Sequence, residues 1–270
     1  DNNDRPGILL SSAIKRYADF FGVSCGKKNV LFTNNDSAYE TAISLIQKRV
    51  KIEAIVDNRE KLDSKLVYEV EKNNVKIFKG FTVVNTLGYK RIREVSIMKL
   101  SIDGQNIVGP KINLSCDCLG VSGGWTPAVH LFTQSGGKLK FRDEDQVFIP
   151  KTYPLNQISV GACSGDFTLD KILTNTPKSL KDFLNIKNSE YDNIEILSSS
   201  NESKRNIWLL PSDKIFGKTK AFVDYQNDAT AKDIKLALRE GFRSIEHVKR
   251  YTTTGMGTDQ GKLGNMHALG

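Results

Sequence analysis

The sequence predicts an α/β protein made of a strand–helix–strand unit, an antiparallel meander and a small helical module near its end. Residues 28–57 read as a strand, an amphipathic helix and a second strand. Residues 81–100 and 107–125 alternate apolar and polar side chains with period two, which is typical of antiparallel strands. Residues 221–270 contain two short amphipathic segments with their own helix start and stop signals.

The composition favours a soluble globular protein and argues against nucleic acid or a membrane as partner. No stretch approaches the roughly eighteen apolar residues of a membrane span, and no signal segment opens the chain. The net charge of +8 is spread along the chain without a basic stripe interleaved with aromatic residues. We expect a cytoplasmic location. Because the sequence starts at Asp1 rather than Met and stops at Gly270 in mid-motif, we also expect an internal piece of a longer polypeptide.

The strand–helix–strand unit has the Rossmann arrangement but lacks the turn that binds a dinucleotide. Such a turn needs G-x-G-x-x-G, so that the backbone can approach a pyrophosphate at the helix N-terminus. Residues 33–37 read Thr-Asn-Asn-Asp-Ser instead, and the carboxylate of Asp36 would repel phosphate. Asp57 occupies the place of the acidic ribose ligand, although an acidic residue there is common by chance. We expect a degenerate Rossmann unit that keeps its fold without binding a cofactor.

The flanking segments extend this unit. Residues 6–22 predict a crossover into a short helix, residues 59–73 a polar helix, and residues 75–80 a third parallel strand. Asp103-Gly104 predicts the turn of the meander. A Rossmann unit followed by a meander is similar to the pyridine-nucleotide domain of glutathione-reductase-like flavoproteins. We therefore expect an FAD/NAD(P)-binding Rossmann-like fold.

The helical module begins with a capping box, in which Thr230 is followed by Asp233 before an apolar helix that ends near Gly241. Ser244 can cap a second helix. Hydroxyls and glycines then alternate through residues 252–262 between two basic groups. Backbone amides, threonine hydroxyls and a lysine can together hold an anion. A glycine-containing surface turn explains the same composition equally well.

Four stretches resemble one protein family, the α subunits of heterotetrameric sarcosine oxidases. They are DCLGVSGGWTPAVHLFTQSGGKLKF at 117–141, FVDYQNDATAKDI at 222–234, REGFRSIEHVKRYTT at 239–253 and GMGTDQGK at 255–262. The resemblance implies oxidation of the N-methyl group of sarcosine to glycine, with oxygen reduced to hydrogen peroxide. The one-carbon unit leaves as formaldehyde or as 5,10-methylenetetrahydrofolate.

The resemblance also implies cofactors and partners. FAD lies on the β subunit, FMN lies between α and β, NAD binds an outer domain of α, and tetrahydrofolate binds a C-terminal α domain. The β, γ and δ subunits are the expected partners. Because the glycine-rich turn for the pyrophosphate would precede Asp1, we expect only the rim of the NAD site here. The residues that the resemblance places at this rim are Gly161, Ala162, Gly165, Asp166, Phe167 and Leu169.

For FMN, the donor-rich loop itself supplies the hypothesis that five side chains face the phosphate: Arg250, Thr252, Thr253, Gln260 and Lys262. The module also resembles the two-iron cluster module of opine- and cyanide-forming flavoprotein dehydrogenases. Its four cysteine positions are held here by Asp224, Gln226, Asp259 and Gly264. Since thiolates hold such clusters, we expect none, and the scattered histidines and cysteines indicate no other metal site.

The expected domain order follows from these assignments. Residues 1–22 lead in from a preceding nucleotide-binding domain, residues 23–125 form the inserted Rossmann domain with its meander, and residues 126–176 return to the outer dinucleotide-binding domain. Residues 177–213 are a linker, which contains a short helix near 180–184 and a strand-like anchor at 207–210. Residues 214–270 form the helical module, which is incomplete at its C-terminus. We expect no catalytic residue in this chain. Two alternatives remain, a subunit of an opine or related amine dehydrogenase and a noncatalytic docking scaffold.

Overall fold

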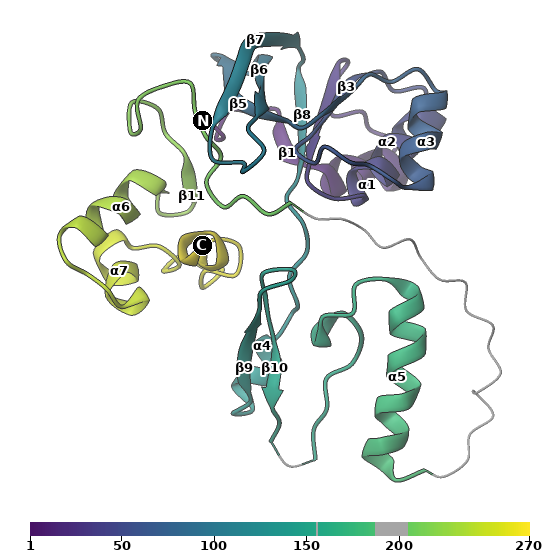
Figure 1. Cartoon of the computed structure of the whole chain (residues 1–270), viewed down its shortest axis with the longest axis vertical. Coiled ribbons are helices and arrows are strands. Elements are labelled where there is room, and N and C mark those ends of the chain that lie inside the picture. Colours follow the sequence, from purple (N-terminus) through teal and green to yellow (C-terminus); the bar gives the residue numbers. More distant parts are fainter. Residues whose placement is uncertain (155, 187–204) are drawn as a thin grey trace. The chain divides into compact units, whose positions relative to one another are not determined.

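The computed structural model describes residues 1–154, 156–186 and 205–270, and it divides into two compact units (Figure 1). The first unit holds residues 1–123 and 207–270, and the second holds residues 124–206. Much of the predicted linker, residues 187–204, lies outside the described residues. No helix within the described ranges is both long enough and apolar enough to cross a lipid bilayer.

The first unit is built on a five-stranded parallel sheet with the strand order β1-β8-β2-β3-β4. Its strands are β1 (Ile8–Leu10), β2 (Asn29–Thr33), β3 (Ile52–Asp57), β4 (Ile77–Lys79) and β8 (Cys118–Ser122). The connecting helices are α1 (Ser11–Phe21), α2 (Ser37–Gln47) and α3 (Lys65–Lys72). The predicted Rossmann arrangement is confirmed. The third helix is shorter than expected because Ser64, whose hydroxyl accepts a hydrogen bond from Leu66 N, caps it.

Alternate residues of the parallel strands enter two different cores. In β2, Leu31 lies in a cluster with α1, α2 and α3, whereas Val30 lies in a cluster with the antiparallel sheet. That second sheet has the order β5-β6-β7 and consists of β5 (Phe81–Gly88), β6 (Ile92–Leu100) and β7 (Ile107–Ser115). The helices therefore cover one face of the parallel sheet and the meander covers the other (Figure 1).

Residues 8–21 belong to this layered structure, so the domain boundary expected after residue 22 is not where the structure divides. β1 pairs in parallel with β8, and α1 buries Ile14 and Ala18 in the helix-side core. A Cβ atom at Gly120 of β8 would lie only 2.6 Å from Leu31 Cδ2 and 2.9 Å from Ile14 Cδ1, so glycine allows this close approach. The apolar spacing of α1 predicted a helix but could not say which sheet the helix covers.

The helical module also lies in the first unit. It consists of β11 (Phe222–Asp224), β12 (Ala229–Thr230), α6 (Ala231–Arg239), α7 (Ile245–Thr252) and α8 (Asn265–Leu269). The predicted capping box is confirmed, because Asp233 N donates to Thr230 Oγ1 and Thr230 N donates to Asp233 Oδ2. Residues 207–210 form no strand, which corrects the expected anchor.

The second unit contains α4 (His130–Gln134), a hairpin of β9 (Lys138–Arg142) and β10 (Val147–Thr152), a 3-10 turn η1 (Gly161–Ser164) and α5 (Leu169–Leu184). Its buried apolar side chains include Phe132, Val147 and Ile149. The predicted short helix near 180–184 is the last part of α5, which runs without interruption across the boundary expected after residue 176.

Candidate functional site

The carboxyl edge of the parallel sheet, where ligands bind in folds of this kind, is filled by a network of buried charges. Asp57 at the end of β3 is fully buried and accepts hydrogen bonds from Arg59 Nε at 3.0 Å and Arg59 Nη2 at 2.7 Å. Tyr39 Oη donates to the same carboxylate at 2.9 Å. Asp36, in the turn before α2, lies 2.8 Å from Arg59 Nη1. Both acids singled out in the sequence are thus paired with an internal arginine.

The network keeps Arg59 charged and Tyr39 protonated. Burial by itself would lower the pKa of Arg59, but the hydrogen bonds and charges of Asp57 and Asp36 raise that pKa above its usual range. Burial, followed by the nearby Asp57 carboxylate, raises the pKa of Tyr39. Tyr39 therefore remains a hydrogen-bond donor and Arg59 remains a counter-ion.

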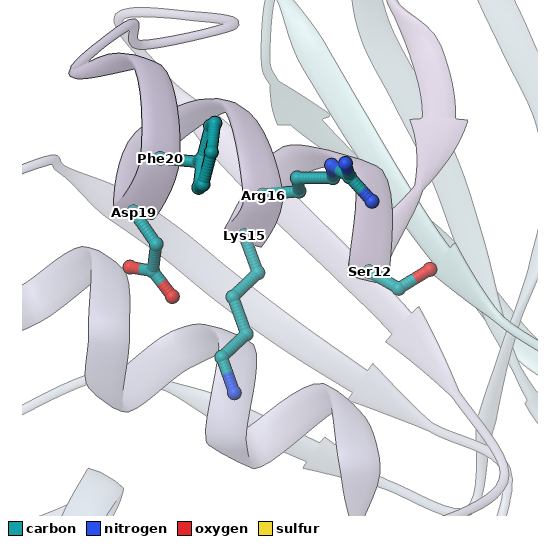
Figure 2. Close-up of a pocket in the computed structure, with 5 residues that line it drawn as sticks. All are labelled: Ser12, Lys15, Arg16, Asp19 and Phe20. Carbon is teal, nitrogen blue, oxygen red and sulfur yellow. The ribbon is translucent and has the colours of Figure 1, made fainter.

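An open hollow on α1 is lined by Ser12, Lys15, Arg16, Asp19 and Phe20 (Figure 2). All five residues come from this one helix. The Lys15 ammonium lies 3.4 Å from a Glu40 carboxylate oxygen of α2, and Asp19 pairs with Lys48 beside α2. None of the predicted cofactor residues lies here, so the hollow provides no candidate site.

The structure brings the six residues predicted for NAD together at η1 and the start of α5. Gly161 and Gly165 are buried and have positive φ angles of +65° and +91°. Asp166 N donates to Gly161 O at 3.1 Å, and Asn175 Nδ2 donates to the Asp166 carboxylate at 3.1 Å. Ala162 and Leu169 are exposed, and Asp166 and Phe167 are half-buried. The result is one tight turn that presents several of these residues at the N-terminus of a helix.

Gly165 should be the least replaceable residue of this turn. A Cβ atom there would lie 2.7 Å from Arg142 Nη2 and 2.9 Å from Ile149 Cγ2, in addition to the strain of φ +91°. Gly136 has the same φ angle with nothing within 4 Å, and it is a matched control. We expect Gly136→Ala to lower the free energy of unfolding by about 1 kcal/mol and Gly165→Ala by about 2–3 kcal/mol. Urea denaturation measures both, and equal losses would contradict the crowding described here.

In the loop of residues 252–262, backbone amides that could hold an anion donate to the module itself. The Asp224 carboxylate, 6% exposed, accepts hydrogen bonds from Gly255 N at 2.7 Å, Gln226 N at 2.8 Å and Asn227 N at 3.2 Å. Burial by itself would raise the pKa of Asp224, but these amide hydrogen bonds hold it below its usual value. Asp224 thus acts as an internal anion at the centre of the module.

Two of the other three positions aligned with cysteines, Gln226 and Asp259, also accept hydrogen bonds from the loop. Gln226 Oε1 accepts hydrogen bonds from Thr258 N at 2.7 Å and from Thr258 Oγ1 at 2.9 Å. The Asp259 carboxylate accepts from Gly261 N and Leu263 N, and a Cβ atom at Gly264 would lie 3.0 Å from Val223 O. In the part of the chain that the structure describes, no three His, Cys, Asp or Glu side chains are grouped to hold a metal ion. Sequence reasoning identified these positions but missed that Asp224, Gln226 and Asp259 act as hydrogen-bond acceptors.

The five residues predicted to face FMN are therefore not equivalent. Three side chains donate within their own helix or turn: Thr252 Oγ1 to Val248 O, Thr253 Oγ1 to Thr252 O and Gln260 Nε2 to Gly257 O. Arg250 donates to Glu246 O and lies 3.6 Å from the Glu246 carboxylate. Lys262 is exposed and forms no ion pair with any described residue. The cations, rather than the hydroxyls or the amides named above, are the groups best able to contact an external anion.

Comparisons with known proteins agree on one relationship. Residues 218–270 match the family model described as the sarcosine oxidase A3 domain. The whole chain is 31% identical, over 278 aligned residues, to sarcosine oxidase subunit alpha from Corynebacterium sp. (strain U-96), and it spans 28% of that protein. The corresponding subunit from Rhizobium meliloti (strain 1021) is 30% identical over 272 residues, which cover 99% of this chain and 26% of the relative.

Among solved structures, L-proline dehydrogenase from P. horikoshii is similar to this chain with a TM-score of 0.56 and 16% sequence identity. The match covers 99% of this chain and 49% of that chain. At this level of identity the likeness concerns the fold alone. It confirms the predicted α/β Rossmann-like fold, and the family model matches the small module that follows.

Proposed function

Since the chain belongs to the family of sarcosine oxidase α subunits, we propose that it is the part of such a subunit that frames cofactors in a flavin-dependent oxidoreductase. The observation that carries this proposal is similarity along the whole chain to subunits of that name. The complete enzyme would oxidise sarcosine to glycine and reduce oxygen to hydrogen peroxide. Formaldehyde or 5,10-methylenetetrahydrofolate would carry the one-carbon unit. Oxygen consumption and peroxide formation by the assembled enzyme with sarcosine test this activity.

The division of labour in this proposal is the one that the resemblance to sarcosine oxidase α subunits implies. FAD on the β subunit and FMN between α and β would supply the redox chemistry, while the protein supplies binding and orientation. NAD would bind the outer domain of α, and tetrahydrofolate a domain of α outside this chain. The β, γ and δ subunits would be its partners. The buried Arg59 network would make the parallel sheet a rigid support, because its ligand edge is occupied by side chains of the chain itself.

For NAD, the proposed contact is the turn of residues 161–169. Ala162 and Leu169 are exposed on this turn, so a dinucleotide could reach it from solvent, whereas Gly165 packs against Arg142 and Ile149 and keeps the turn tight. The first amides of α5 point out of the helix N-terminus, which favours a phosphate. Equilibrium dialysis of NAD with the full-length α subunit tests this contact. We expect Ala162→Trp, at an exposed position of the turn, to reduce NAD binding by steric exclusion.

For FMN, we expect Lys262→Glu to weaken retention of the flavin in the assembled enzyme by roughly tenfold, which corresponds to about 1.4 kcal/mol. The physical reason is repulsion between the new carboxylate and the FMN phosphate. Lys218→Glu makes the same charge change at another exposed lysine of the module and is the matched control. Flavin absorbance after gel filtration measures retention. Equal FMN content in the two variants would contradict a contact between Lys262 and the FMN phosphate.

Two alternatives make different predictions for the same preparation. A related amine dehydrogenase would pass electrons from its substrate to an artificial dye but would produce no peroxide from oxygen. A noncatalytic scaffold would retain neither NAD nor flavin in the assembled state. Parallel assays of dye reduction, peroxide formation and cofactor content distinguish the three functions.

A further inference from the structure

Residues 1–5 lie between the helical module and the antiparallel sheet and form hydrogen bonds with both. On the module side, the Asn3 amide accepts from Phe222 N at 2.8 Å and donates to Phe222 O at 2.9 Å. The backbone of Asn2 donates to Lys220 O at 2.7 Å. One asparagine side chain thus satisfies both backbone groups of a residue in β11, as a neighbouring strand would.

On the sheet side, the same segment is held by β5. Asn2 Nδ2 donates to Asn85 Oδ1 at 2.9 Å, and Thr86 Oγ1 donates to Asn2 O at 2.7 Å. Arg5 Nε donates to Thr86 O at 3.2 Å. Asn85 and Thr86 are 4% and 2% exposed, so the sheet end of the contact is buried. When a buried hydrogen bond is lost, its donor and acceptor have no water to bond with instead, so the loss is more destabilising than at the surface.

The segment is therefore the middle of a continuous path from the sheet to the loop of the module. Phe222 is 9% exposed and lies two residues before Asp224, whose carboxylate accepts from Gly255 N in that loop. An ion pair between Lys111 of β7 and Asp213 also joins this sheet to the segment before the module. Lys111 is 40% exposed, and partly exposed ion pairs contribute little, typically about 0–1 kcal/mol. The amide contacts of Asn2 and Asn3 are the better candidates for a specific connection.

We propose that Asn2 and Asn3 form a clasp that fixes the helical module to the antiparallel sheet, and that Asn3 is a positioning residue for the loop of residues 252–262. The clasp follows from the contacts alone, whereas its effect on a cofactor rests on the proposed FMN role of that loop. An amide is required because Asn3 both accepts from and donates to the backbone of Phe222. Alanine removes both of these hydrogen bonds and also the one that Asn3 Nδ2 donates to Tyr225 Oη at 2.7 Å. Aspartate keeps the hydrogen bond that Phe222 N donates and cannot donate to Phe222 O.

Asn3→Ala in the full-length α subunit, assembled with its partner chains, tests the clasp by amide hydrogen exchange. We expect roughly tenfold faster exchange at residues 220–226, equivalent to about 1.4 kcal/mol of lost local stability. Exchange in β2 and β3 should stay as in wild type. Asn106→Ala, at an exposed asparagine in the turn between β6 and β7, should change neither region. Asn3→Asp should lie between Asn3→Ala and wild type, and Asn3→Gln should recover part of the protection because it retains both groups.

Flavin absorbance of the same samples separates the clasp from the proposed function. Faster exchange at 220–226 with loss of FMN supports both the clasp and its positioning role. Faster exchange with full FMN content supports the clasp and overturns the FMN role of the loop. Wild-type exchange at 220–226 in Asn3→Ala overturns the clasp. If Asn3→Ala does not assemble, Asn3→Asp serves as the test with the same criteria, since it keeps one of the two hydrogen bonds.

Discussion

Replacing Arg59 with alanine should lower the free energy of unfolding of the chain by about 3–5 kcal/mol, because it leaves buried carboxylates without their counter-ion. Arg59 is 4% exposed and Asp57 is fully buried, so water cannot replace the lost guanidinium without local opening. Asp36 loses the same partner. Urea denaturation followed by circular dichroism measures the change.

The matched control for Arg59 is an exposed ion pair of the same unit. Lys15 and Glu40 lie 3.4 Å apart, with side chains that are 36% and 56% exposed, and Lys15→Ala should change the free energy of unfolding by about 0–1 kcal/mol. Asp57→Asn should be nearly as severe as Arg59→Ala, since it leaves the guanidinium buried beside a neutral amide. A loss below about 1 kcal/mol in Arg59→Ala would contradict the assigned role of the network.

Asp224→Asn should destabilise the helical module by about 3 kcal/mol. The carboxylate, which accepts hydrogen bonds from several backbone amides, would be replaced by a neutral amide in which only the oxygen accepts and the nitrogen donates. The new amide nitrogen would face either Gly255 N–H or Gln226 N–H, and two donors cannot pair. Asp228→Asn makes the same chemical change at an exposed position of the module and should have little effect. Hydrogen exchange at residues 252–262 measures the difference, and equal exchange in the two variants would show that Asp224 does not hold the loop.

The stabilisation by Asp224 should also depend on pH, with a definite sign. The pKa of Asp224 is lower in the folded protein than in the unfolded chain, where an aspartate has a pKa of about 3.9. The stabilisation is therefore fully present above the unfolded value and is lost as pH falls through the folded value. We expect the midpoint temperature of thermal unfolding, measured from pH 7 to pH 2.5, to be higher for wild type than for Asp224→Asn at pH 7, and the difference between the two proteins to shrink towards pH 2.5. A constant difference over that range would contradict the depressed pKa.

The two charged centres have one consequence for function in common. Arg59 fills the ligand edge of the sheet, and Asp224 occupies the amide-lined centre of the module. In both places an internal ion pairs with groups that could otherwise contact an external ligand. What remains available includes the turn of residues 161–169 and the exposed Lys262, which is why the proposed cofactor contacts lie at the surface, where other chains can complete them.

Local chemistry determined much of the fold from the sequence. The apolar spacing of residues 28–57 and the period-two pattern of residues 81–100 and 107–115 predicted the parallel and antiparallel sheets, because side-chain spacing reports which face of an element is buried. The antiparallel pairing expected as far as residue 125 is wrong for residues 118–122, which form β8 and pair in parallel with β1 and β2. The capping box of Thr230 and Asp233 was predictable for the same reason, since its two residues lie within one helical turn.

The tertiary structure alone decided which polar groups are partners. Sequence reasoning named the loop amides and hydroxyls as donors that can hold an anion, but Gly255 N donates to Asp224, 31 residues earlier. It assigned no role to Asn3, whose partner Phe222 is 219 residues away. Spacing along a chain predicts contacts within an element, whereas a hydrogen bond between distant residues exists only once folding has brought the donor and acceptor within about 3 Å of each other.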